Sequence, residues 1–348
     1  MKKKSITMEE IARYANVSTM TVFRTINTPE VVKKETLNKI VDAMNVLGYK
    51  INLKSKIEKR KNKNNLCYTV GVCLCGFQNV FETESLYFFE IMKGIEEGAK
   101  INGYNIILHY LMQEHERTTH KDQLLKDGLI DGLIVVSPNY FDSTLENLQN
   151  KGYNLVTVSG YTESGQIDFV DGNNLEGIKM GVEHLVNEGH TRIAFIGGKS
   201  IYSNAIDRFE GFKEALKNFN IPFVEEYVIE GDFLYETAMR STNRLFKLKI
   251  PPTAIVAASD TMAIAAIQTI KELGMKVPED ISVIGFDDIY PDMNPALTTI
   301  HQPLNEMGKR AFEILLNKIN DNSNKQVVQE FIPMNLIIRE SSGKNNKS

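Results

Sequence analysis

The stretch Ile11-Ala-Arg-Tyr-Ala-Asn-Val-Ser-Thr-Met-Thr-Val-Phe-Arg24 decides the fold of the first fifty residues. Just before it, Thr7 and Glu10 have the three-residue spacing of a capping box, which predicts the start of a helix. Apolar residues then recur at helical spacing until Asn16, a residue type that tolerates the left-handed conformation of a tight turn. Ser18 follows at a position where its side chain can cap a second helix.

This second helix is expected from Thr19 to about Thr25, with Val22 facing the core. Thr19, Met20 and Arg24 then lie on its outward, N-terminal side. A recognition helix presents residues of this kind to base edges in the major groove. The pattern therefore predicts a helix-turn-helix that binds DNA.

The charge distribution supports this prediction. Residues 1–65 contain 15 Lys and Arg against 6 Asp and Glu, whereas residues 66–348 contain 25 against 38. The net charge of −4 thus combines a basic head of +9 with an acidic body of −13. Such asymmetry is typical of a nucleic-acid-binding module joined to a second kind of domain.

The length of 348 residues is enough for two or three domains. No apolar run of 18 residues is present, and no apolar signal core follows the basic N-terminus, so we expect a cytoplasmic protein. Cys67, Cys73 and Cys75 lie in or beside one apolar strand, and no second cysteine pair or histidine cluster completes a zinc site. We expect buried, reduced thiols and no metal.

A third helix is expected from Lys34 to Leu47, with Gly48 just past its end. Its inner stripe is expected to comprise Ile40, Val41, Met44 and Leu47. The composition then becomes polar and strongly basic. We therefore divide the chain into a helix-turn-helix domain at 1–50, a basic hinge at 51–65, a two-lobed ligand-binding and dimerisation domain at 66–343 and a disordered tail at 344–348.

From Leu66 onward, apolar runs alternate with helical patterns. Strands are expected at 68–75, 105–110, 132–136, 154–158, 192–197, 254–258 and 281–286. Helices are expected at 87–102, 120–128, 174–188, 207–218, 235–247 and 261–273. This alternation predicts parallel sheets with right-handed crossovers, and the length favours two doubly wound α/β lobes. Ligands of such sheets bind at the carboxyl ends of the strands, which places a pocket between the lobes.

Several blocks make the chain similar to the lactose-repressor family. The head motif resembles the family's turn pattern of Ala-Gly-Val-Ser followed by Thr-Val-Ser-Arg. Further similar blocks are Asn187-Glu-Gly-His-Thr-Arg-Ile-Ala-Phe-Ile-Gly-Gly198, Ala258-Ser-Asp-Thr-Met-Ala263, Val277-Pro-Glu-Asp-Ile-Ser-Val-Ile-Gly-Phe-Asp-Asp288 and Pro295-Ala-Leu-Thr-Thr-Ile-His-Gln-Pro303. The resemblance implies an all-α head followed by a body like a periplasmic binding protein.

By this resemblance, the DNA-binding residues are Thr7, Ser18, Thr19, Met20, Thr21, Arg24, Asn27 and Lys56. The hinge departs from the family pattern because Ile51 replaces a proline, Ser55 replaces an alanine and Glu58 occupies the place of an apolar wedge. A glutamate cannot insert between base steps as an apolar side chain does. We therefore expect the hinge to contribute mainly positive charge.

The resemblance also implies an effector pocket. The residues expected to contact the effector are Tyr87, Phe88, Asn173, Tyr202, Asn204, Arg208, Phe233, Ser259, Asp260 and Asp287. Arg208 is expected to hold hydroxyls or a carboxylate through its planar guanidinium, with an ion pair between the lobes as the alternative. Arg208 and Asp287 are expected to come from separate strand ends, with Asp287 as an acceptor. Asp260 is expected as an acceptor or only a helix cap, and Asp288 as the cap of a turn.

No phosphate-binding or dinucleotide-binding glycine motif with the required spacing is present, and no nucleophile has a recognisable base, so we expect no enzyme. The sequence predicts a homodimeric repressor of transcription without a cofactor, which binds operator DNA and is switched by a small molecule. The family default for that molecule is a sugar or sugar acid. A purine is the alternative effector, and a solute-binding protein is the alternative class.

Overall fold

The computed structural model describes residues 7–27, 32–47, 66–75, 85–111, 128–290, 292–321 and 326–345. Contacts divide the chain into two compact units, Met1–Leu66 and Cys67–Ser348, which we call the head and the body. No helix in the described ranges is both long and apolar enough to cross a membrane.

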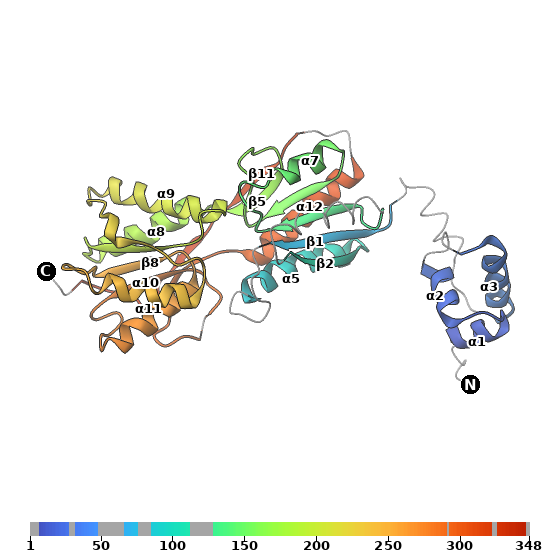
Figure 1. Cartoon of the computed structure of the whole chain (residues 1–348), viewed down its shortest axis with the longest axis horizontal. Coiled ribbons are helices and arrows are strands. Elements are labelled where there is room, and N and C mark those ends of the chain that lie inside the picture. The colour runs from blue at the N-terminus through green and yellow to red at the C-terminus, as the bar shows by residue number, and fades with distance from the viewer. Residues whose placement is uncertain are drawn as a thin grey trace. The chain divides into compact units, whose positions relative to one another are not determined.

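The described residues of the head form three helices, α1 (Met8–Tyr14), α2 (Thr19–Asn27) and α3 (Lys34–Leu47) (Figure 1). The bounds of α3 agree with those expected from the sequence. The three helices enclose one small apolar core, which consists of Ile11, Ala12, Ala15, Val22, Ile40, Ala43 and Met44.

Local hydrogen bonds determine where the first two helices begin. The capping box is confirmed, because the N–H of Glu10 donates to Oγ1 of Thr7 at 3.3 Å and the N–H of Thr7 donates to Oε2 of Glu10 at 2.9 Å. Asn16 has a φ of 51° and supplies the left-handed residue of the turn. The N–H of Thr21 donates to Oγ of Ser18 at 3.1 Å, so Ser18 caps α2 as expected.

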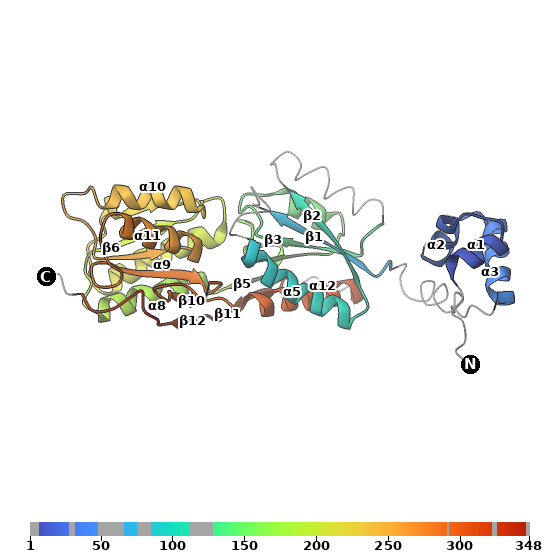
Figure 2. The same cartoon turned by 90° about the horizontal axis from the view of Figure 1, so that it is seen from below.

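The body contains two six-stranded sheets (Figures 1 and 2). The strands of the first sheet, in spatial order, are β2 (Asn105–Leu111), β1 (Thr69–Cys75), β3 (Gly132–Val136), β4 (Leu155–Val158), β5 (Asp168–Gly172) and β11 (Gln329–Ile332). Those of the second are β7 (Val228–Glu230), β6 (Ile193–Gly197), β8 (Ala254–Ala257), β9 (Ser282–Asp287), β10 (Thr298–His301) and β12 (Asn335–Ile337). All neighbouring pairs are parallel except β10 and β12.

Helices pack against each sheet and complete two lobes. The first lobe contains α5 (Ser85–Ile101), α7 (Thr144–Asn150) and α12 (Leu304–Asn320). The second contains α8 (Asn174–Asn187), α9 (Ser203–Asn218), the short 3-10 helix η2 (Glu225–Tyr227), α10 (Tyr235–Leu245) and α11 (Asp260–Glu272). The expected fold of two doubly wound lobes is therefore confirmed.

The chain passes between the lobes three times, after β5, after β10 and after β11. In each sheet the strand order reverses beside the first strand of the lobe, between β1 and β3 and between β6 and β8. A parallel sheet opens a crevice at such a reversal, outside the carboxyl ends of its strands. The two crevices meet in the pocket described below.

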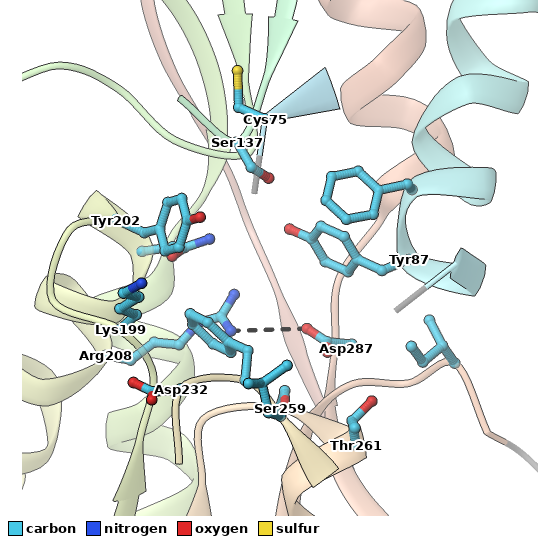
Figure 3. Close-up of a pocket in the computed structure, with 15 residues that line it drawn as sticks. Cys75, Tyr87, Ser137, Lys199, Tyr202, Arg208, Asp232, Ser259, Thr261 and Asp287 are labelled. Atoms are coloured by element: carbon cyan, nitrogen blue, oxygen red, sulfur yellow. Dashed lines mark ion pairs between the residues drawn. The ribbon is translucent and has the colours of Figure 1, made fainter. Parts of the chain in front are cut away.

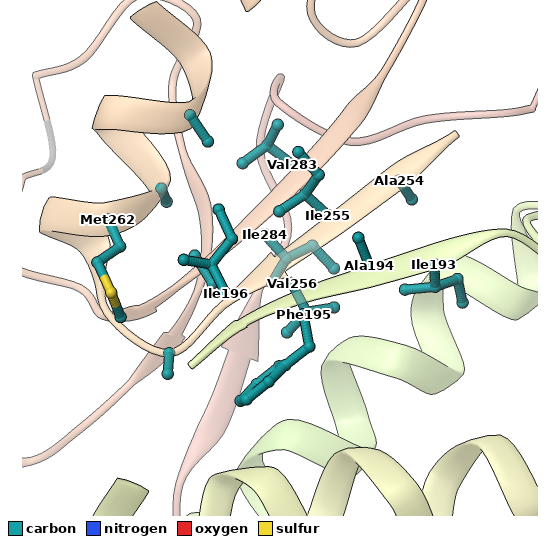
Figure 4. Close-up of a cluster of buried hydrophobic side chains, with 14 of the residues drawn as sticks. Ile193, Ala194, Phe195, Ile196, Ala254, Ile255, Val256, Met262, Val283 and Ile284 are labelled. Carbon is teal, nitrogen blue, oxygen red and sulfur yellow. The ribbon is translucent and has the colours of Figure 1, made fainter. Parts of the chain in front are cut away.

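The second lobe has a continuous apolar core around β6, β8 and β9 (Figure 4). Ile196, Val256 and Ile284 lie on adjacent strands and are all fully buried. Their branched side chains suit strands that are covered on both faces. Because burial removes apolar surface from water, this core holds the strand ends rigidly beneath the pocket.

Several elements of the body were not predicted from the sequence. These are α7, α12, η2, β5, β7, β10, β11 and β12. The missed strands have three to five residues, too few for a clear alternation of apolar and polar residues. The helix expected at 120–128 lies almost entirely outside the described residues, as do the hinge at 51–65 and the last three residues of the tail.

Candidate functional site

One pocket lies between the two lobes and encloses about 750 Å³ of space, part of it open to solvent (Figure 3). Its walls combine aromatic rings with a small number of polar and charged groups. The lining residues are Cys75, Tyr87, Phe88, Ser137, Lys199, Tyr202, Asn204, Arg208, Asp232, Phe233, Leu234, Ser259, Thr261, Asp287 and Ile289. A concave site with this composition is typical of a binding site for a small molecule.

The two strand-order reversals supply four of these residues. Cys75 ends β1 and Ser137 follows β3 in the first lobe, while Lys199 follows β6 and Ser259 follows β8 in the second. The pocket thus occupies both crevices at once. Its position follows from the topology of the sheets.

Arg208 on α9 is the central cation of the pocket, and only 2% of it is exposed. Its Nε donates to Oδ1 of Asn174 at 2.8 Å and its Nη1 donates to the carbonyl of Ala258 at 2.5 Å. The guanidinium carbon lies 3.8 Å from the ring centroid of Phe286, and Nη1 is 3.9 Å from Oδ1 of Asp287. Arg208 is therefore held from several sides. Its acidic partner belongs to the same lobe, so the expected alternative of an ion pair between the lobes is wrong.

Asn174 connects Arg208 to a buried carboxylate of the first lobe. Its Nδ2 donates to Oδ2 of Asp171 and to the carbonyl of Gly172, both at 3.1 Å. These two acceptors determine which end of the amide faces Arg208. Burial raises the pKa of Asp171 to about 7, and the charge of Arg208 opposes this rise.

Asp287 accepts from Nε2 of Gln302 at 2.6 Å and stands opposite Arg208. Burial raises the pKa of Asp287 to about 6, whereas Arg208 and Gln302 lower it. Its φ of 123° is rare for a residue with a side chain, and the packed strand end maintains this strain.

Aromatic rings form the remaining walls. The hydroxyl of Tyr87 forms a hydrogen bond with Oγ of Ser159, and burial raises the pKa of Tyr87 above its usual value. Phe233 has a φ of 63°, and its ring occupies the space beside Gly198, where a Cβ would lie 2.0 Å from the ring. Gly198 is thus required for the close approach of Phe233.

Two buried polar atoms of the pocket have no hydrogen-bond partner within the described part of the chain. They are Nη2 of Arg208, a donor, and Oδ1 of Asn204, an acceptor. Both residues lie on α9, and only 7% of Asn204 is exposed. An unsatisfied buried polar group costs about 1–3 kcal/mol, so a ligand that supplies both partners gains affinity.

Eight of the ten expected effector residues line the pocket, and two do not. Oδ1 of Asn173 accepts from the N–H of Glu176 at 3.3 Å and caps α8. Asp260 is buried beneath the pocket, where it accepts from Oγ1 of Thr299 at 2.5 Å and from the N–H of Ile289 at 2.9 Å. Burial is the largest cause that raises the pKa of Asp260.

Three further expectations need correction. Ser259, and not Asp260, provides the cap of α11, since it accepts from the N–H of Met262 at 3.3 Å. Asp288 caps no turn among the described residues, and its carboxylate instead pairs with Nη2 of Arg339 at 2.7 Å and with Nδ1 of His301 at 3.0 Å. Arg208 lies in a helix and not at a strand end.

Seven lining residues were not predicted from the sequence. These are Cys75, Ser137, Lys199, Asp232, Leu234, Thr261 and Ile289. The position of Cys75, Ser137 and Lys199 at or just after strand ends was a usable signal, because the strands themselves were predicted.

In the head, the expected DNA-contacting residues of the turn and of α2 whose side chains are described are accessible. Ser18, Thr19 and Met20 are exposed, with 59% of Met20 accessible, and Thr21 is partly exposed. Arg24 and Asn27 belong to α2, but their side chains lie outside the described part of the structure, as does all of Lys56. The exposed face of α2 is suited to the major groove.

A helix-turn-helix head combined with a two-lobed body around a small-molecule pocket defines a ligand-responsive regulator that binds DNA. Comparisons with known proteins support this class. Residues 7–52 match the family described as bacterial regulatory proteins, lacI family, and residues 182–342 match a periplasmic binding protein-like domain.

Curated relatives cover nearly the whole chain. The HTH-type transcriptional repressor PurR of Vibrio vulnificus is 32% identical over 98% of this chain and 99% of its own length. The repressor of the same name from Photobacterium profundum is 34% identical over 96% of this chain and 98% of its own length.

Two solved structures are similar over the same span. The transcriptional regulator CelR in complex with cellobiose has a TM-score of 0.74 and 26% identity, and covers 97% of this chain and 99% of its own. The lac repressor dimer bound to operator and the anti-inducer ONPF has a TM-score of 0.74 and 26% identity, and covers 98% of this chain and 100% of its own. The chain therefore belongs to the LacI family of bacterial regulatory proteins, and it is a DNA-binding transcriptional repressor.

Proposed function

We propose that the protein binds a near-palindromic operator as a homodimer in the cytoplasm and that a sugar or sugar acid in the interlobe pocket changes its operator affinity. The structure of the lac repressor dimer on its operator supports the dimeric part of this proposal. One short recognition helix reads few bases, so two heads are needed for a specific site. The pocket acts as a regulatory site, and we assign it no catalytic role.

The two unpartnered atoms of α9 carry the proposal for the effector. Nη2 of Arg208 requires an acceptor and Oδ1 of Asn204 requires a donor. A hydroxyl group can fill both roles, and a sugar offers several hydroxyls at once. The carboxyl of Asp287 adds a further acceptor, and the rings of Tyr87 and Phe233 supply apolar walls for the sugar ring. The complex of CelR with cellobiose is consistent with this class.

A purine is the second candidate. The relatives named PurR, at 32–34% identity over nearly the whole chain, favour it. The same aromatic walls suit a flat base, whose ring nitrogens and exocyclic groups also donate and accept hydrogen bonds. Whether sugars or purines bind therefore distinguishes the two candidates.

The test is a thermal-shift screen of the whole chain with neutral sugars, sugar acids, sugar phosphates and purines, followed by calorimetry of each hit. Asn204→Ala and Arg208→Ala should each weaken the hit by ~2 kcal/mol, about 30-fold, because a buried polar group of the compound loses its partner. Asn173→Ala is the matched control, since Asn173 caps α8 without lining the pocket. Purine hits without sugar hits would favour the second candidate. Unchanged affinity in both pocket variants would mean that the compound binds elsewhere.

DNA binding is tested separately with operator fragments selected from random sequence. We expect Arg24→Ala to weaken binding by ~1–3 kcal/mol and Met20→Ala to alter base preference. Neutralising four basic hinge residues should reduce the salt dependence and leave the sequence preference nearly unchanged. These residues are Lys56, Lys59, Arg60 and Lys61. Wild-type affinity in Arg24→Ala at physiological salt would contradict the assignment of the recognition helix.

A further inference from the structure

Tyr161 connects the two lobes beside the pocket. It follows β4 of the first lobe, and its hydroxyl donates to both carboxylate oxygens of Asp207 on α9 of the second lobe, each at 2.9 Å. Its backbone N–H donates to Oγ of Ser203 at 3.0 Å. The N–H of Tyr140, in the loop after β3, donates to the carbonyl of Ile201 at 2.7 Å and makes a second contact between the lobes.

The first lobe holds the ring of Tyr161 in place. The ring stacks on Phe169 with centroids 4.9 Å apart, and it makes edge contacts with Tyr140 at 6.0 Å and Phe331 at 6.1 Å. An immobilised ring presents its hydroxyl in one direction, so the bond to Asp207 costs little additional side-chain entropy.

Gly160 allows the approach of this loop to α9. Its φ is 138°, a conformation that residues with a side chain rarely adopt, and a Cβ would lie 3.2 Å from Oγ of Ser203. The carbonyl of Gly160 accepts from Oγ1 of Thr157 at 2.7 Å, which anchors the turn to β4. The loop is therefore built for close contact with the other lobe.

We propose that Tyr161 and Asp207 form an interlobe latch that positions α9 against the first lobe. Asp207 immediately precedes Arg208, and Asn204 lies one turn earlier on the same helix. Any movement of the lobes that breaks the latch therefore also moves Asn204 and Arg208 relative to the first-lobe wall of the pocket. The latch contributes to the free-energy difference between arrangements of the lobes, which is the quantity that an effector must shift. This role does not depend on the identity of the effector.

The test is residue-resolved amide hydrogen exchange on the whole chain without added ligand. Tyr161→Phe removes only the hydroxyl, and a hydrogen bond to a charged group is among the stronger ones in proteins. We expect the N–H of Tyr140, which bonds across the lobes, to exchange at least about tenfold faster. Tyr140→Phe is the matched control, because this variant keeps the backbone N–H and the hydroxyl of Tyr140 forms no hydrogen bond with the described residues. The buried amide of Ile284 on β9 serves as the internal reference.

Asp207→Ala should reproduce the effect of Tyr161→Phe, since it removes the acceptor instead of the donor. Faster exchange at Tyr140 in both variants, with Ile284 unchanged, supports the latch. Wild-type exchange at Tyr140 in both variants would overturn it. An equal acceleration at Ile284 would also overturn it, because that result indicates a general loss of stability.

Discussion

Replacing Gly94 with alanine should destabilise the body strongly, because α5 and α12 cross there without room for a side chain. A Cβ on Gly94 would lie 1.9 Å from the carbonyl oxygen of Asn305, about 1.5 Å short of the 3.4 Å at which ordinary contact begins. The obstacle is the backbone of α12, which cannot rotate away as a side chain can. Overpacking costs typically ~1–3 kcal/mol, occasionally more, and here we expect a cost above ~3 kcal/mol.

Gly98→Ala on the same helix is the matched comparison. Its Cβ would lie 2.8 Å from Cδ1 and 3.1 Å from Cβ of Phe312, and this obstacle is a side chain, which can shift where the backbone of α12 cannot. Both substitutions gain about 1 kcal/mol of helix propensity, so this gain cancels in the comparison. We expect a net loss of ~2–3 kcal/mol for Gly94→Ala and a change near zero for Gly98→Ala.

The assay is thermal unfolding followed by far-UV circular dichroism. For a unit of this size, ~1 kcal/mol corresponds to a shift of about 2–4 °C, so Gly94→Ala should melt about 5–10 °C below Gly98→Ala. A loss of effector affinity should accompany it, because α5 also carries Tyr87 and Phe88 of the pocket. Equal melting temperatures for the two variants would refute the argument from helix contact.

Three further predictions concern the turn of the head and two buried titratable groups. Asn16→Ala should speed exchange of the α1 amides and Asn16→Gly should not, since the φ of 51° suits glycine and opposes alanine. Burial raises the pKa of Asp171 to about 7, so the folded state loses stability as the pH rises from about 4 to 7 and this carboxyl ionises. Asp171→Asn cannot ionise, so its melting temperature should rise relative to that of the wild type between pH 5 and pH 8. A constant difference would count against it. Burial lowers the pKa of His190, so its neutral imidazole stabilises the fold above the unfolded pKa of about 6.5. This stability is lost as the pH falls, because the buried ring must then take up a proton. His190→Gln should therefore show a smaller drop in melting temperature from pH 7.5 to pH 5.5 than the wild type.

The sequence by itself determined the features that depend on neighbours within about four residues. The capping box of Thr7 and Glu10, the left-handed Asn16 and the cap from Ser18 could all be predicted, because their hydrogen bonds join residues at most three positions apart. The apolar strands and their order also indicated two parallel sheets, and hence a pocket where the strands end.

Only the tertiary structure decided which side chains meet in that pocket and what holds them. The bond from Arg208 to Asn174 joins residues 34 positions apart, and the one from Tyr161 to Asp207 spans 46. Asp260 shows the same limit, because its hydrogen bond with Thr299 holds the carboxyl beneath the pocket, where it does not line the wall. Local pattern places a residue at a strand or helix end, but the packing of distant elements determines the direction of its side chain and its hydrogen-bond partners.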